Sequence, residues 1–102
     1  MKIAREEIFG PVLVAIAYED QDDAIRIANQ SAYGLSGSVW TADPDRGYQV
    51  AIKVRTGTYN VNGFIIDFGA PFGGYKASGI GREFGPEGIA CYTETKSIAF
   101  FG

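Results

Sequence analysis

The sequence has no histidine and only one cysteine among its 102 residues. Without an imidazole there is no Ser-His or Cys-His pair to activate a nucleophile, and no zinc site of the usual nitrogen-sulfur type, so we expect no metal site. A single cysteine cannot form an intramolecular disulfide, which indicates a reducing compartment, by default the cytoplasm. Cys91 lies among small and aromatic residues, and we interpret it as a packed side chain because free cysteines are commonly buried.

Long apolar runs and basic clusters are also absent. No apolar run approaches the ~20 residues that cross a bilayer. The first residues contain neither a long apolar region nor a small-residue cleavage site, so we expect no membrane segment and no secretory signal. The net charge is −3 with no cluster of lysine or arginine. Because phosphate neutralisation supplies most nucleic-acid affinity, we do not expect a nucleic-acid partner.

The composition that remains is typical of one small globular domain, with 46% apolar and 21% charged residues. A chain of this size buries roughly 60–65% of its unfolded surface, which allows a core but a thin one. We therefore treat residues 1–102 as a single unit.

Residues 11–62 show the alternation of strands and helices that predicts an α/β fold. Residues 12–18 are a nearly continuous apolar run, typical of a strand that is covered on both faces. Asp20 can cap a helix with one apolar face, which should end before Tyr33. Residues 38–41 then predict a second strand.

Asp43, followed by proline, predicts the start of a second helix, because it can accept from a free backbone N–H while proline presets φ. Gly57 predicts where this helix stops, with Lys53 and Arg55 in its last turn. Residues 58–62 predict a third strand. Since the connections are too long for hairpins, we predict a three-stranded parallel βαβαβ core.

Residues 63–88 are rich in glycine and have no helical or strand period. A long stretch of this kind in a small domain generally indicates a functional loop. Glycine lets the main chain approach another surface closely, which suits a loop pressed against a ligand pocket or another polypeptide. Residues 92–100 carry threonine and aromatic residues that predict a terminal strand.

Two glycine pairs in this loop have the spacing of phosphate-binding motifs but not their context. After Gly79 and Gly81, the third glycine of the dinucleotide pattern is replaced by Phe84, and no apolar strand precedes the pair. Gly69 and Gly74 are spaced like the opening of a phosphate loop, but no Gly-Lys-Ser/Thr follows. Neither pair therefore predicts a phosphate site.

Four motifs in combination resemble the C-terminal part of the NAD(P)+-dependent aldehyde dehydrogenases. They are Glu-Glu-Ile-Phe-Gly-Pro at residues 6–11, Asn-Gln-Ser-Ala-Tyr-Gly-Leu-Ser-Gly-Ser-Val-Trp-Thr at 29–41, Thr-Gly-Thr-Tyr-Asn-Val-Asn at 56–62 and Pro-Phe-Gly-Gly-Tyr-Lys-Ala-Ser-Gly-Ile-Gly-Arg-Glu at 71–83. The resemblance covers residues 3–100. It implies a partial aldehyde dehydrogenase fold with a terminal strand of the oligomerisation type, and a Met1 that corresponds to an internal position of a longer reading frame.

The resemblance implies one cofactor wall and one substrate wall. Glu7 corresponds to a glutamate that accepts hydrogen bonds from the ribose hydroxyls beside the nicotinamide, and Phe9 to a phenylalanine that packs near the nicotinamide. Judged without the family, the adjacent carboxylates of residues 6 and 7 would simply be solvated. Phe64, Phe68 and Phe72 are candidates for the wall of the aldehyde tunnel, although three aromatics among glycines could equally form a small core cluster.

Structural or subunit-interface places are implied for a further set: Asn62, Lys76, Ser78, Arg82, Glu83 and Glu94. Asn62, Lys76 and Ser78 are expected to pin the loop. Arg82 and Glu94 resemble a pair that joins the loop to the terminal strand near the subunit interface.

The family oxidises an aldehyde to a carboxylic acid with NAD or NADP, and its reacting groups have no counterpart in this sequence. The Gly-Gln-x-Cys nucleophile motif, the base glutamate, the oxyanion asparagine and the adenine-binding domain are missing. We therefore expect no catalytic residue here, no activity of the chain alone and no tight cofactor binding. Two alternatives remain, an interaction module that pairs with itself, with a relative or with a missing N-terminal part, and a small βαβ nucleotide binder.

Overall fold

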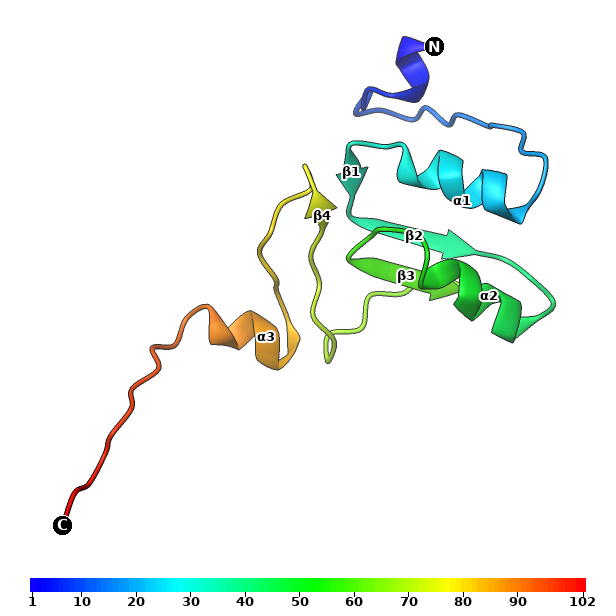
Figure 1. Ribbon diagram of the computed structural model, residues 1–102. Coiled ribbons are helices and arrows are strands. Elements are labelled where there is room, and N and C mark those ends of the chain that lie inside the picture. Colours follow the sequence, from blue (N-terminus) through cyan, green and yellow to red (C-terminus); the bar gives the residue numbers. More distant parts are fainter.

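The computed structural model describes residues 1–102 and belongs to the α/β class (Figure 1). Its elements in chain order are a 3-10 turn η1 (Lys2–Ala4), α1 (Gln21–Asn29), β1 (Tyr33–Gly34), β2 (Ser36–Val39), α2 (Pro44–Ala51), β3 (Thr58–Val61), β4 (Tyr75–Lys76) and α3 (Gly85–Ala90). No helix has the length and apolar character that would span a membrane.

The central unit is a β2–α2–β3 crossover. β2 and β3 are parallel, with Ser36 opposite Thr58 and Val39 opposite Val61. α2 packs on this small sheet through Gly47, where an added Cβ would lie 2.6 Å from Cγ1 of Val61. The absence of a side chain at this position lets the helix approach the strand closely.

The predicted three-stranded core is wrong in one respect, because residues 12–18 form no strand. They run in an extended path from η1 to α1 without a ladder of backbone hydrogen bonds (Figure 1). Leu13 remains 93% exposed and Ile16 52% exposed. A buried strand needs neighbours on both edges and covering layers on both faces, and the 102 residues supply no strand that pairs with this segment.

The predicted terminal strand at residues 92–100 is also wrong. This segment is extended but unpaired, and it leads away from the rest of the molecule to the C-terminus (Figure 1). Cys91, predicted as a packed side chain, is exposed and its Sγ donates to the carbonyl of Gly88 at 3.0 Å. Both corrections have one cause, since no element of this chain covers the region that follows α3.

Both helix starts are confirmed. The side chain of Asp20 accepts from the backbone N–H of Asp23, and that of Asp43 accepts from the backbone N–H of Arg46, with Pro44 in the first turn. α2 ends at Ala51, earlier than predicted. Beyond it, the side chain of Asn29 bonds to the carbonyl of Lys53 and the N–H of Arg55, which replaces the next helical turn.

The glycine-rich stretch 63–88, predicted to lack regular structure, contains two short elements. β4 pairs antiparallel with β1 over two residues, and α3 is a single short helix of six residues. Phe72 and Glu83 form an isolated antiparallel bridge. Elements this short cannot produce a sequence period, so the pattern gave no signal for them.

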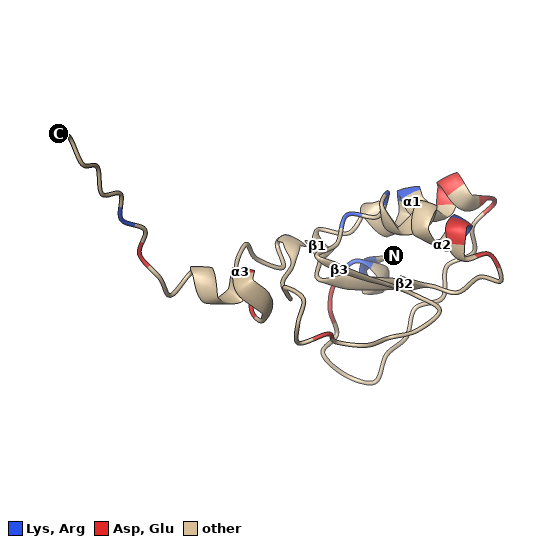
Figure 2. Cartoon of the chain, turned by 90° about the horizontal axis from the view of Figure 1, so that it is seen from below, with Lys and Arg blue, Asp and Glu red and all other residues tan.

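The apolar core is much smaller than a chain of this size normally forms. Val54, 8% exposed, is the one buried hydrophobic residue, while the chain extends over 68 × 33 × 22 Å. Acidic residues lie in the first turns of α1 and α2 (Figure 2), where their negative charge favours the positive helix ends. Elsewhere long stretches carry no charged residue (Figure 2), and many of their large apolar side chains are exposed. The fold is therefore held mainly by polar contacts.

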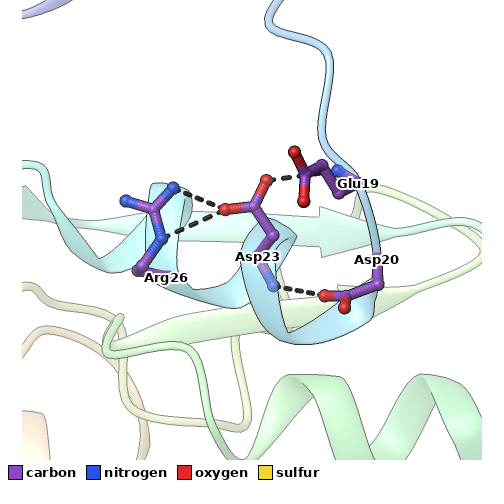
Figure 3. A network of polar contacts seen from close by, with 4 residues as sticks. All are labelled: Glu19, Asp20, Asp23 and Arg26. Atoms are coloured by element: carbon purple, nitrogen blue, oxygen red, sulfur yellow. Dashed lines mark hydrogen bonds and ion pairs between the residues drawn. The ribbon is translucent and has the colours of Figure 1, made fainter.

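The start of α1 illustrates such a polar contact network (Figure 3). Asp23 receives hydrogen bonds from the guanidinium of Arg26 and from the backbone N–H of Glu19, while its own N–H donates to Asp20. The Arg26 hydrogen bonds, followed by that of Glu19, hold the pKa of Asp23 below its ordinary value. The Asp23 carboxylate thus binds both Glu19, which precedes α1, and Arg26, which lies one turn further along it.

We expect α1 to lose helicity in acid through Asp23. A carboxyl group whose pKa is lower in the folded than in the unfolded state stabilises the fold above its unfolded pKa, and this contribution disappears as the pH falls through the folded pKa. Circular dichroism between about pH 5 and 2 should show the loss, and D23N should weaken the helix at neutral pH and flatten the acid dependence. D22N, which removes an exposed carboxylate with no side-chain contact, is the control; an equal effect there would contradict the assignment.

Candidate functional site

Glu7 and Phe9 border an open hollow of about 580 Å³ at the N-terminal segment. Its lining comes entirely from residues 3–14. Glu6 forms an ion pair with Lys2 at 3.7 Å, whereas the carboxylate of Glu7 has no hydrogen bond or ion pair within the chain. Phe9 has φ +53° and is 93% exposed, so a backbone unusual for a bulky residue presents this ring outwards.

A second hollow of about 350 Å³ is shared by Glu7 and the glycine-rich loop. Its lining includes Glu7, Ser31, Tyr33 and Ser78. Glu7 and Ser78, which are 71 positions apart in the sequence, therefore line one pocket. The residue pattern alone does not indicate that they are close.

The glycine-rich loop is fastened to the end of α1 by Lys76. Its ammonium donates to the carbonyl oxygens of Asn29 and Ser31, both at 3.0 Å. A cation suits this place because the C-terminal carbonyls of a helix carry partial negative charge. Alongside it, Ser78 Oγ accepts from the N–H of Gly34 at 3.0 Å and the N–H of Ala77 donates to Ala32.

Asn62 joins the carboxyl ends of the two parallel strands. Its side-chain amide donates to the carbonyl of Thr41 at 2.8 Å and accepts from the Thr41 N–H at 2.7 Å. Its backbone has φ +56°, a left-handed conformation that asparagine tolerates better than most residues. The side chain therefore continues the strand pairing one step beyond β2 and β3 and turns the chain into the loop.

Arg82 and Glu94 do not form the expected pair. Arg82 instead donates to the carbonyls of Gly74 at 2.9 Å and Gly81 at 2.7 Å, and its guanidinium lies 5.7 Å from the ring centroid of Tyr75. Glu94 lies in the extended terminal segment and makes no ion pair. Because that segment has no surface to pack on, it cannot return to Arg82. Glu83 contributes through its main chain, which bridges Phe72.

Two of the three candidate tunnel phenylalanines lie together, around a third ring that the resemblance did not indicate. Phe84 contacts Phe68 edge-on, with ring centroids 5.0 Å apart, and Phe72 at 6.3 Å. Phe64 is 73% exposed and has no aromatic partner. The only sequence signal for Phe84 was its place directly after the Gly-Arg-Glu motif, in the position where the dinucleotide pattern would need a glycine.

The chain matches known proteins along nearly its whole length. The sequence profile described as the aldehyde dehydrogenase family matches residues 1–98, and the chain belongs to this family. It is 54% identical over 101 residues to geranial dehydrogenase from Castellaniella defragrans and 53% identical over 98 residues to 3-succinoylsemialdehyde-pyridine dehydrogenase from a Pseudomonas species.

Solved structures show the same similarity. An aldehyde dehydrogenase of Mycobacterium tuberculosis, complexed with NAD+, is 58% identical with a TM-score of 0.90 over 92% of this chain. Aldehyde dehydrogenase C of Pseudomonas syringae, a mutant complexed with NAD+ and octanal, is 50% identical with a TM-score of 0.92 over 96% of this chain.

The chain spans only about a fifth of the length of these proteins. The matches cover 99% and 96% of this chain but 21% and 20% of the two curated relatives, and 20% of each of the two solved chains. The similarity is therefore to one part of a larger enzyme.

The first hollow offers an unpaired carboxylate and an exposed aromatic ring. A carboxylate without a partner can accept from two vicinal hydroxyls, and Glu7 is such a carboxylate beside an outward-facing aromatic ring. Close packing in the loop occurs at Gly73, which lies against Gly81 and Arg82, and at Gly74, which lies against Ser78.

The attachment of the loop to β3 should depend on Gly57. An added Cβ there would lie 1.6 Å from the carbonyl oxygen of Gly73, so Gly57→Ala must displace the loop, at a cost of ~1–3 kcal/mol. We expect faster hydrogen exchange at the Gly57 and Ala77 amides, which donate to Gly34 and Ala32. Gly81→Ala is the matched control because nothing lies within 4 Å of its added Cβ. Equal exchange rates in both variants would show that the loop does not rest on residue 57.

Proposed function

We propose that this chain is the C-terminal part of the catalytic domain of an NAD(P)+-dependent aldehyde dehydrogenase, and that it is inactive alone. The observation that carries the proposal is a family match over residues 1–98 that corresponds to only about a fifth of each relative. We place the complete enzyme in the class that converts an aldehyde to a carboxylic acid, in the cytoplasm.

The part proposed for Glu7 and Phe9 is to hold the nicotinamide end of the cofactor. Glu7 would accept from the two ribose hydroxyls, since its carboxylate is not engaged within the chain. Phe9, 93% exposed, would cover the neighbouring apolar surface. When bound, NAD(P)+ supplies the acceptor for the hydride that leaves the aldehyde. The chain itself provides the wall that orients this cofactor.

The part proposed for the glycine-rich loop is to line the aldehyde tunnel. Phe68 and Phe72 form the wall together with Phe84, and Phe64 extends it from the other end of the loop. Asn62 and Lys76 hold the loop on the βαβ unit through the bonds described above. The reacting cysteine, base and oxyanion donor would come from outside this chain.

A chimera tests the proposal. Residues 1–102 would replace the matching segment of the Castellaniella geranial dehydrogenase, which is 54% identical over 101 residues. We expect the chimera to oxidise geranial with NAD+ and the isolated chain to show no turnover. E7Q should raise the KM for NAD+ about 10- to 100-fold, because hydrogen bonds to a charged acceptor contribute ~1.5–3 kcal/mol.

E6Q is the matched control, since the Glu6 carboxylate faces Lys2 instead and should leave the KM for NAD+ unchanged. An inactive chimera, turnover by the purified chain, or equal effects of E6Q and E7Q would each contradict the proposal.

A second candidate, an interaction module, is favoured by the uncovered apolar segment after α3. Ile98, Phe100 and Phe101 are 70%, 93% and 96% exposed, and the backbone around them has no strand partner. An unpaired extended segment is a template for pairing with another chain. In this case the short chain would act by binding a copy of itself or a full-length relative.

Sedimentation velocity of the isolated chain should then show an average mass that rises with concentration. Replacing Phe100 and Phe101 by serine should shift the chain toward the monomer, while Tyr48→Ser, at a position 62% exposed on α2, should not. A monodisperse monomer with no affinity for a full-length relative would exclude this candidate.

A further inference from the structure

We propose that Phe84 is a positioning residue of the aldehyde wall, which sets the orientations of Phe68 and Phe72 and so selects the size of the aldehyde. This inference rests on the proposed function, because Phe84 would act through those two rings. The sequence motifs gave Phe84 no place in the site.

The ring geometry is the first argument. The Phe84 and Phe68 rings meet at an interplanar angle of 82° with centroids 5.0 Å apart, and the Phe84 and Phe72 rings at 45° and 6.3 Å. Edge-to-face contacts are directional, since the positive edge of one ring faces the negative face of the other. Phe84 is the shared member of both pairs, so its position fixes the angle between the two wall rings.

The exposed fractions of the two rings support the view that Phe84 positions Phe68, and not the reverse. Phe84 is 38% exposed, while Phe68 is 70% exposed. Phe68 therefore has little other packing to orient it, and its contact with Phe84 contributes a large share of what holds it. The side chain that touches the aldehyde and the side chain that places it would be different residues.

The backbone holds Phe84 to Phe72 from one side. Phe72 and Glu83 exchange two backbone hydrogen bonds, each 2.7 Å long. The carbonyl of Phe84 accepts from Gly88 at 3.0 Å, and Gly88 packs so closely that an added Cβ would lie 2.7 Å from the carbonyl carbon of Glu83. α3 therefore closes directly onto the residue that precedes Phe84.

The backbone holds Phe84 to Phe68 from the other side. An added Cβ on Gly85 would lie 3.1 Å from the carbonyl oxygen of Gly69 and 3.3 Å from the carbonyl carbon of Ala70. Phe84 itself has φ +61°, which is unfavourable for a bulky side chain and persists only where the surroundings impose it. Both neighbours in sequence thus fix Phe84 between the segments that carry the two wall rings.

The experiment uses the active chimera defined above and varies residue 84. F84L keeps an apolar side chain but removes the ring, and F84M is the second variant, because methionine fills irregular spaces without an aromatic face. We expect both to raise the KM for octanal about 3- to 10-fold and to reduce the preference for octanal over propanal by a similar factor. The KM for NAD+ and the kcat should change less than 3-fold. F84Y, which retains the aromatic ring, should keep the preference of the unsubstituted chimera for octanal over propanal.

Ile80→Ala in the same loop, at a position 97% exposed, is the control and should be silent. A purely structural Phe84 would lower kcat equally for both aldehydes and leave the KM ratio unchanged, which would overturn the inference. F68A and F72A separate it from the proposed function. If they alter the aldehyde preference and F84L does not, only the inference fails; if they are also without effect, the wall assignment fails with it.

Discussion

The ammonium of Lys76, set against the carboxyl end of α1, is the charged contact that fastens the glycine-rich loop to the βαβ unit, beside the short β1–β4 pairing. It reaches from the glycine-rich loop to the carbonyls of Asn29 and Ser31. Asn29 in turn uses its side chain to hold the end of α2. The first α-helix, the second α-helix and the loop therefore meet at a single asparagine. The distance between the hollow at Glu7 and the aromatic group of Phe68, Phe72 and Phe84 depends on this meeting point.

Polar contacts carry this architecture because apolar burial is nearly absent. Individual hydrogen bonds contribute ~1 kcal/mol each, whereas burial of apolar surface is normally the dominant favourable term in folding. Here Val54 is the one buried hydrophobic residue, and side chains such as Leu13 and Ile80 are more than nine-tenths exposed. The chain therefore has the backbone arrangement of part of a domain, but it lacks the apolar burial that usually stabilises a domain. Under the proposed function, the remaining surfaces of an aldehyde dehydrogenase would supply this burial.

The sequence predicted the features that depend on neighbouring residues. Asp20 and Asp43 cap helices through contacts three residues away, so the starts of α1 and α2 could be read locally. The strands expected at residues 12–18 and 92–100 could not, because a strand exists only through a partner that the sequence does not name. In the candidate site, Glu7 and Phe9 stay predictions from the motif, and the structure adds that Glu7 and Ser78 line one pocket. The sequence did not indicate Phe84, because its proposed role depends on contacts with Phe68 and Phe72 that form only when the chain folds.

The uncovered apolar surface has a consequence for the life of such a polypeptide in a cell. Exposed phenylalanine and isoleucine side chains on an extended, unpaired backbone are the features that chaperones bind and proteases cleave. A chain that buries one hydrophobic residue would offer them from Leu13 to Phe101. The cellular abundance of this chain would depend on how fast it binds a partner that covers its apolar surface. Chains that stay uncovered would be degraded.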